Sequence, residues 1–247
     1  MPWRSTRDPY KIFVSEVMLQ QTQVDRVKTK YLLFVEEFPN FEKLARARLH
    51  EVLRAWNGLG YNRRALYLKK SAEIVVSLHD GRLPDDPRVL MTFLGVGAAT
   101  AASIAACAFN KPTVFIETNI RSVFIHFFFA GKTKVYDRQI VPLVEKTLDH
   151  TKPREWYFAL MDYGAMLKKK QRNPSRASAH HTRQSKFEGS ARQIRGKILA
   201  LLNRYDSLTQ AVLITKIGDK ERRTPAILAQ LIREGLVVQE KNIVRLP

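Results

Sequence analysis

The stretch LGVG at residues 94–97, followed at once by AATAASIAACAF at residues 98–109, is the first specific clue to the fold of this 247-residue chain. Two glycines around one apolar residue allow the backbone to turn sharply and to bring its N–H groups close to a ligand. The small apolar residues that follow contain no Gly or Pro, which predicts a closely packed helix. The first N–H groups of a helix have no partner within it and favour an anion. The stretch therefore predicts a turn and a helix that can hold a phosphate.

Helical patterns lie on both sides of this turn. Apolar residues recur at helical spacing through most of the chain up to residue 170, and Asn-Gly, Asp-Gly or Pro stand at the segment ends. A lone G-x-G turn is weak evidence, but its helical flanks make it a helix-hairpin-helix. The predicted helices span residues 41–56, 62–79, 87–93, 98–109, about 118–129, 137–149 and 154–170.

The composition shifts at Lys168. From residue 168 to residue 197 there are ten Lys or Arg and one acid, Glu188, which indicates a linker or a docking segment for phosphates, or simply a solvated connector. Beyond it, QIRGKILALL, SLTQAVLITKIG and TPAILAQLIREG predict three short helices, and LVVQEKNIVRLP predicts a two-stranded hairpin that turns near residues 240–242. We therefore expect a helical core at 1–170, a basic linker at 171–189 and a winged-helix-like domain at 190–247.

The overall charge indicates a polyanionic partner. There are 42 Lys and Arg against 23 Asp and Glu, and the net charge is +19. A merely soluble basic surface, or association with ribosomes, is the alternative. The single cysteine, Cys107, lies in an apolar run and cannot form an internal disulfide, which fits a reducing compartment. No secretory signal or membrane span is evident, so we expect a soluble cytoplasmic protein without membrane contact.

An acid interrupts the apolar pattern of SEVMLQQTQV, residues 15–24. Phe13, Val17 and Val24 belong to one apolar helical stripe, and Glu16 and Gln20 stack on one face at its edge. An unpaired carboxylate beside buried surface is costly, so a functional reason is expected.

A second carboxylate, Glu117, stands in VFIETNIRSV at residues 114–123, where a helix is predicted to begin. Glutamate near a helix N-terminus is also an ordinary charge-dipole choice. Together with Glu16, however, it offers two acids in different environments, whose pKa values could be pushed apart. One protonated acid and one ionised carboxylate are what cleavage of a glycosidic bond requires.

These motifs carry a family resemblance. The runs PWRSTRDPYKIFVSEVMLQQTQV, WNGLGYNRRA, LGVG and VFIETNIRSV, in this order, resemble the A/G-mismatch adenine DNA glycosylases (MutY-type) of the helix-hairpin-helix (HhH-GPD) superfamily. The likeness covers about residues 1–170. It implies an all-α, two-lobed core that receives a base flipped out of duplex DNA, here with a small C-terminal winged-helix (α+β) domain.

The resemblance also implies roles for individual residues. Glu16 matches the general acid that protonates the leaving adenine, and Glu117 stands where the family normally has Asp to stabilise the oxocarbenium sugar. The implied substrate-binding residues are Trp3 and Arg4 in the base pocket, Asp162 against the flipped base, Gln21 and Tyr61 as wedges in the duplex, and Gln20 and Asn119 as supports. The implied DNA-binding residues are Leu94, Gly95, Val96, Gly97 and Arg121. As a structural alternative, the glutamines cap buried backbone.

Three departures from the family shape the expected activity. Bifunctional relatives carry a lysine in the hairpin's second helix, where this chain has Ala99, so we expect base excision without AP-lyase activity. Cys107 alone cannot hold the usual iron-sulfur cluster, and His180-His181 lack further ligands. We expect no cofactor and no metal centre, with a monovalent cation at the hairpin as the one ion considered. We also expect this chain to lack the MutY-type domain that recognises 8-oxoguanine.

The leading hypothesis is a monofunctional DNA glycosylase of base excision repair that removes adenine opposite guanine or 8-oxoguanine. Two alternatives stay open: a thymine or uracil mismatch glycosylase on the same fold, and a DNA-binding protein that has lost catalysis. The expected partner is double-stranded DNA with a mismatched or damaged base. We expect a monomer associated with a prokaryotic nucleoid.

Overall fold

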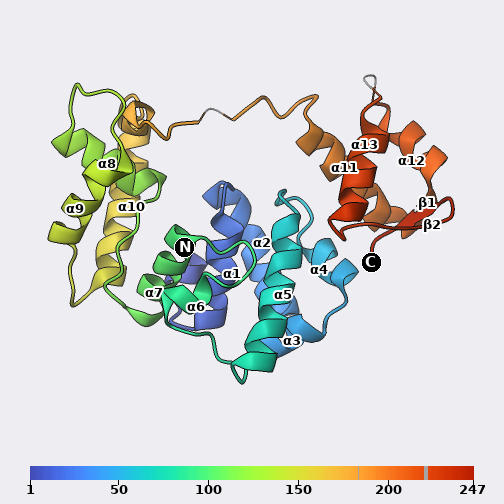
Figure 1. Ribbon diagram of the computed structural model, residues 1–247, viewed down its shortest axis with the longest axis horizontal. Helices are drawn as coiled ribbons and strands as arrows, with labels where there is room; N and C mark the ends of the chain where they lie inside the picture. Colours follow the sequence, from blue (N-terminus) through green and yellow to red (C-terminus); the bar gives the residue numbers. More distant parts are fainter. Residues whose placement is uncertain (183, 220–221) are drawn as a thin grey trace.

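The computed structural model describes residues 1–182, 184–219 and 222–247, and it shows a mainly helical protein (Figure 1). The elements in these ranges, in chain order, are η1 (Pro2–Arg4), α1 (Pro9–Leu19), α2 (Val24–Glu37), α3 (Phe41–Arg46), α4 (Leu49–Ala55), α5 (Arg63–Leu78), α6 (Pro87–Leu90), α7 (Ala98–Phe109), α8 (Thr118–Phe128), α9 (Asp137–Thr147), α10 (Pro153–Lys170), η2 (Pro174–Ala177), α11 (Ala191–Tyr205), β1 (Ser207–Thr209), α12 (Gln210–Ile217), α13 (Thr224–Arg233), β2 (Val238–Glu240) and β3 (Ile243–Arg245).

Two hydrophobic clusters divide the helices up to α10 into two lobes. One cluster fills the space among α1 to α7, and the other lies among α7 to α10. Helix α7 contributes to both, because Ala101 and Ile104 belong to the first cluster while Ala102 and Ala106 belong to the second. Small side chains allow neighbouring helices to approach α7 from two sides, which places this helix between the lobes.

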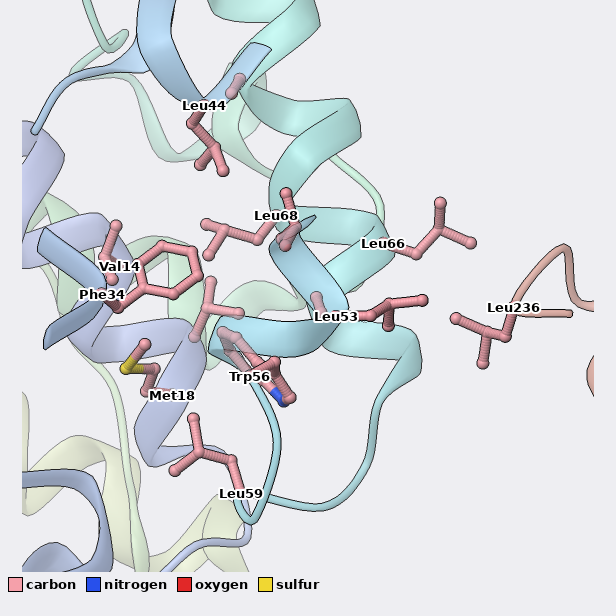
Figure 2. Packing of buried hydrophobic residues seen from close by; sticks show 14 of the residues in the cluster. Val14, Met18, Phe34, Leu44, Leu53, Trp56, Leu59, Leu66, Leu68 and Leu236 are labelled. Atoms are coloured by element: carbon pink, nitrogen blue, oxygen red, sulfur yellow. The ribbon is translucent and has the colours of Figure 1, made fainter. Parts of the chain in front are cut away.

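The C-terminal helices α11, α12 and α13 pack beside α4 and α5, at the end of the molecule opposite α8 to α10 (Figure 1). Their apolar side chains continue the first cluster: Leu236 lies beside Leu53 and Leu66 (Figure 2). The backbone N–H of His50 also donates to the carbonyl of Pro247 at 3.1 Å. The C-terminal part therefore shares its apolar core with the first lobe.

The predicted fold class is confirmed, with two local corrections. The single helix expected over residues 41–56 is broken into α3 and α4, because Arg48 is extended and its N–H donates to Oε2 of Glu51 at 2.7 Å, which starts a new helix. The hairpin of β2 and β3 is joined by a third strand, β1, in the antiparallel order β1-β3-β2. Residues 207–209 therefore form a strand where a helix start was expected. None of the helices in the described ranges has the length and hydropathy that a membrane crossing requires.

Candidate active site

Glu16 lies on α1, on the side that faces α7. Asp8 caps this helix by accepting the N–H of Tyr10 at 2.9 Å, and the neighbours of Glu16, Ser15 and Val17, are buried. Glu16 itself is partly exposed. Its Oε2 accepts a hydrogen bond from the Ser103 hydroxyl of α7 at 2.6 Å. The general-acid candidate therefore lies between two helices with a single neutral donor beside it.

Glu117 is the N-cap of α8. Its Oε1 accepts the N–H groups of Asn119 and Ile120 at 2.7 and 2.8 Å, and its Oε2 accepts Asn119 Nδ2 at 3.3 Å. The side chain stays partly exposed. Capping explains why an acid suits this position, as the charge-dipole alternative anticipated. It also fixes the orientation of the carboxylate.

The two carboxylates influence each other. Burial raises the pKa of Glu16, and the negative charge of Glu117 raises it further, while the Ser103 hydrogen bond and the positive charge of Arg4 act in the opposite direction. A raised pKa keeps a proton on a carboxyl group towards neutral pH, which a general acid requires. The structure thus brings Glu16 and Glu117 into one electrostatic environment, and both reach solvent.

Helix α10 supports the second carboxylate from behind. Lys168 Nζ donates to Asn119 Oδ1 at 2.7 Å, and burial lowers the pKa of this lysine. Gly164 allows the two helices to touch, because a Cβ at this position would lie 2.2 Å from the carbonyl oxygen of Asn119. A lysine and a glycine of one helix therefore position Asn119, the residue that Glu117 holds.

The N-terminal residues lie against the same helix. Arg4 pairs with Asp162 at 2.7 Å and stacks on Phe158, 4.4 Å from the ring centroid. Trp3 is 96% buried and packs edge-on against Tyr31 in the first cluster, so it acts in the core. Arg4 and Asp162, far apart in the sequence, thus form an ion pair. The roles of these two residues and of Trp3 in a base pocket stay predictions.

The hairpin at residues 94–97 has the expected turn. Gly95 has a φ of 76°, and a Cβ there would lie 2.7 Å from the ring of Tyr67. Gly97 is the N-cap of α7 and has no side chain to cap it, which leaves the first N–H groups of the helix open to an anion. Leu94 is exposed and Val96 is buried. Gln20 ties α1 to this turn, since its Nε2 donates to the Gly95 carbonyl at 3.1 Å.

Gln21 and Tyr61 lie at neighbouring turns with positive φ values of 53° and 48°. Arg64 joins these turns: it is buried and donates to the carbonyls of Gln20 and Gly60 at 2.7 and 3.1 Å. Both candidate wedge residues line a cavity of about 390 Å³ that the linker and α11 complete. The hydroxyl of Tyr61 accepts a hydrogen bond from Gln184 of the linker.

Arg121 is engaged in an ion pair. Its guanidinium makes two hydrogen bonds to Asp137, at 2.7 and 2.6 Å, and the pair lowers the pKa of Asp137. Arg121 also lines a second cavity of about 440 Å³, together with Gln21, Thr118 and His180. Asp137 already compensates the charge of Arg121. The contact of Arg121 with DNA stays a prediction.

The residues present do not fit an iron-sulfur cluster. Cys107 is buried in α7, and burial raises the pKa of its thiol. In the described part of the chain no group of three or more His, Cys, Asp or Glu could hold a metal ion.

Sequence reasoning missed Ser103, Lys168 and Arg64. Lys168 and Arg64 gave no separate signal, because Lys168 begins the basic run KKK and Arg64 directly follows another arginine, Arg63. Ser103, in the run AATAASIAACAF, had none: a serine among alanines reads as a small packing residue. Its contact with Glu16 emerges only when α1 and α7 are placed side by side.

The two helical lobes, the glycine hairpin and the coupled acids define a helix-hairpin-helix DNA glycosylase. Comparison with known proteins agrees, since residues 14–144 match the family described as "HhH-GPD superfamily base excision DNA repair protein". The chain belongs to this family.

Individual relatives point the same way. The chain is 32% identical to an adenine DNA glycosylase of Mycolicibacterium smegmatis over 97% of this chain and 88% of that protein. It is 33% identical to one of Buchnera aphidicola over 68% of this chain, although the match spans about half, 48%, of that protein. A solved thermostable thymine-DNA glycosylase superposes with a TM-score of 0.62 and 28% identity, covering 70% of this chain and 82% of that one.

Proposed function

We propose that this protein is a monofunctional DNA glycosylase that flips a mispaired adenine, opposite guanine or 8-oxoguanine, out of duplex DNA and hydrolyses its N-glycosidic bond. The observation that carries the proposal is the partly buried Glu16, whose pKa is raised by burial, within the electrostatic reach of the capping carboxylate Glu117. The names of the adenine DNA glycosylase relatives support the substrate. The net charge of +19 supports DNA as the partner.

The chemistry follows from the two acids. Glu16 gives its proton to a ring nitrogen of the base as the bond to the sugar breaks, so the base leaves neutral and the sugar becomes an oxocarbenium ion. The ionised Glu117 stabilises this cation. Water then attacks the sugar and gives a proton back to the Glu16 carboxylate. The products are a free base and an abasic site, and Glu16 is protonated again.

Strand cleavage is not part of this proposal. A lyase needs an amine that attacks the sugar and forms a Schiff base. Ala99, in the first turn of α7, has no such group. We expect borohydride to trap no covalent complex with abasic DNA, whereas a trapped complex would contradict the monofunctional assignment.

A panel of duplexes tests the activity. Each duplex holds one mispair and is incubated with protein in excess, then treated with alkali to cut at abasic sites. We expect cleavage at adenine opposite guanine or 8-oxoguanine, and a loss of about 10²–10⁴-fold in Glu16→Gln. Absence of abasic sites from every mispair, or full activity in Glu16→Gln, would contradict the proposal and favour a DNA-binding protein without catalysis.

A second candidate is removal of thymine or uracil opposite guanine. The likeness to the solved thymine-DNA glycosylase favours it, as does Glu117 in place of the aspartate expected for adenine enzymes. The same panel separates the two, because guanine mispairs with thymine or uracil would then be cut in preference to those with adenine.

A further inference from the structure

The hydroxyl of Ser103 is used differently from those of the other buried serines in the described α-helices. Ser15, Ser71 and Ser122 each donate to a carbonyl three or four residues earlier in their own helix, at 2.8 Å. This is the usual bond of a serine inside a helix. Ser103 donates instead across the helix interface, to Oε2 of Glu16 at 2.6 Å. Its side chain serves a neighbour, not its own backbone.

The contact belongs to a register between two helices. Gln20, the C-cap of α1 and four residues after Glu16, donates from Nε2 to the hydroxyl of Thr100, which lies three residues before Ser103 on α7, at 3.3 Å. Residues three or four apart share a helix face, so both pairs lie along the same seam. Ser103 is 95% buried and cannot swing out to water. The seam therefore fixes the Glu16 carboxyl group relative to the hairpin.

We propose that Ser103 is the positioning residue of the reaction: by donating to Oε2, it directs the proton of Glu16 to Oε1. The inference rests on the proposed function, in which Glu16 gives that proton to the departing base. An oxygen that already accepts a strong hydrogen bond is the weaker site for a proton. Within the described residues no other protein group hydrogen-bonds to Glu16, so Oε1 is left for the substrate. The hydroxyl thus decides which oxygen acts as the acid.

The Ser103 hydrogen bond also affects the pKa of Glu16, and with it the pH range in which Glu16 is protonated. The charged groups that act on Glu16 are Glu117, the N-cap of α8, and Arg4 on η1, while Arg154 on α10 acts on the neutral thiol of Cys107, one turn along α7 from Ser103. Burial raises the pKa of Glu16, and the Ser103 bond is the largest influence that lowers it. Removing the hydroxyl disfavours the carboxylate, so Glu16 stays protonated to higher pH.

Single-turnover kinetics test the positioning role. In Ser103→Ala we expect the excision rate at its optimum to fall about tenfold, as expected when one hydrogen bond to a charged group is lost from the transition state. The alkaline limb of the pH profile should move to higher pH, with DNA affinity unchanged. Ser103→Thr keeps the hydroxyl and should restore both. Ser15→Ala removes a buried serine hydroxyl beside Glu16 without touching it and is the matched control.

A double-mutant cycle tests the contact without any activity. Free energies of unfolding are measured in urea for the wild type, Ser103→Ala, Glu16→Gln and the double variant, at pH 4 and pH 8. We expect a coupling between the two positions that is larger at pH 8, where Glu16 bears more charge. Zero coupling, or a pH profile of Ser103→Ala that matches Ser15→Ala, would overturn the inference. Coupling without excision of any base would refute the proposed function and leave the contact established.

Discussion

The most informative single residue is Glu16, because folding raises its pKa and so lets it keep its proton to a higher pH than in the unfolded chain. Because burial raises the pKa of Glu16 above 4.5 in the folded state, the folded protein binds a proton that the unfolded chain releases. The contribution of Glu16 to stability is therefore fully present below about pH 4.5 and is lost as the pH rises through its folded pKa. The raised pKa of Glu16 favours a protonated general acid, and it lowers the free energy of unfolding at a pH where Glu16 is ionised.

The raised pKa of Glu16 predicts how the stability of Glu16→Gln depends on pH. The variant cannot lose a proton, so it should melt at a higher temperature than the wild type at pH 8, and the difference should shrink towards pH 4. Thermal unfolding followed by circular dichroism at several pH values measures it. Glu145→Gln, an exposed site on α9, is the control and should show no such trend. A difference independent of pH would rule out titration of Glu16 as the cause.

Glu117 has a structural and a proposed chemical role, which substitutions can separate. Aspartate is among the preferred N-cap residues, so Glu117→Asp should keep its stability within about 0.5 kcal/mol, whereas Glu117→Ala should lose about 1 kcal/mol. We expect Glu117→Asp to retain excision and Glu117→Ala to lose about 100-fold. Urea unfolding and single-turnover excision measure the two roles. If Glu117→Ala excised bases at the wild-type rate, Glu117 would be a cap only.

At the scale of elements, Arg64 closes the C-terminal end of α1. Besides Gln20 and Gly60, it donates to the carbonyls of Val17 and Met18 at 2.9 and 2.8 Å, and burial lowers its pKa to about 10. Arg64→Met would leave these carbonyls without partners and should cost roughly 3 kcal/mol. Urea unfolding measures the loss. Arg46→Met, an exposed site on α3, is the control, and an equal loss in both would contradict the capping role.

Two helical glycines should respond in opposite directions. Gly164→Ala would push α10 away from Asn119 and should cost about 1–3 kcal/mol, with slower excision because Glu117 moves. Gly196→Ala in α11 meets no atom within 4 Å and should gain about 0.5–1 kcal/mol by helix propensity. Unfolding in urea compares the two variants. A stable Gly164→Ala would show that the helices can separate without cost.

The elements also show what the sequence could predict. Helical periodicity and the glycines at 95 and 97 sufficed for the hairpin and most helices, because these signals are local. The break at Arg48 depends on one backbone conformation, and β1 exists only because β3 lies beside it. For the site, the motifs predicted Glu16 and Glu117 as a pair of acids, the structure places them within electrostatic reach of each other, and their catalytic roles stay predictions. Ser103 was not, since its role depends on the packing of α1 against α7.

In the molecule as a whole, the described parts of the basic linker, residues 171–182 and 184–189, lie between the lobe of α8 to α10 and the C-terminal helices (Figure 1). Arg176 and Lys186 are exposed on it. If they contact phosphates, replacing both by Gln should weaken DNA binding and reduce the slope of log K against log salt by about 1 for each contact. Fluorescence anisotropy at several salt concentrations measures this. Lys43→Gln on α3 is the control, and an unchanged slope would make the linker a mere connector.

The apolar cluster that Leu236 shares with Leu53 and Leu66 has a consequence for the history of such a chain (Figure 2). A domain connected to the rest of a protein only by a flexible linker could be exchanged between genes without destabilising the rest of that protein. Here the deletion of residues 190–247 would expose apolar side chains on α4 and α5 to solvent, and the truncated protein would tend to aggregate. Recombination could therefore replace residues 190–247 only with another segment whose apolar side chains cover the same surface of α4 and α5.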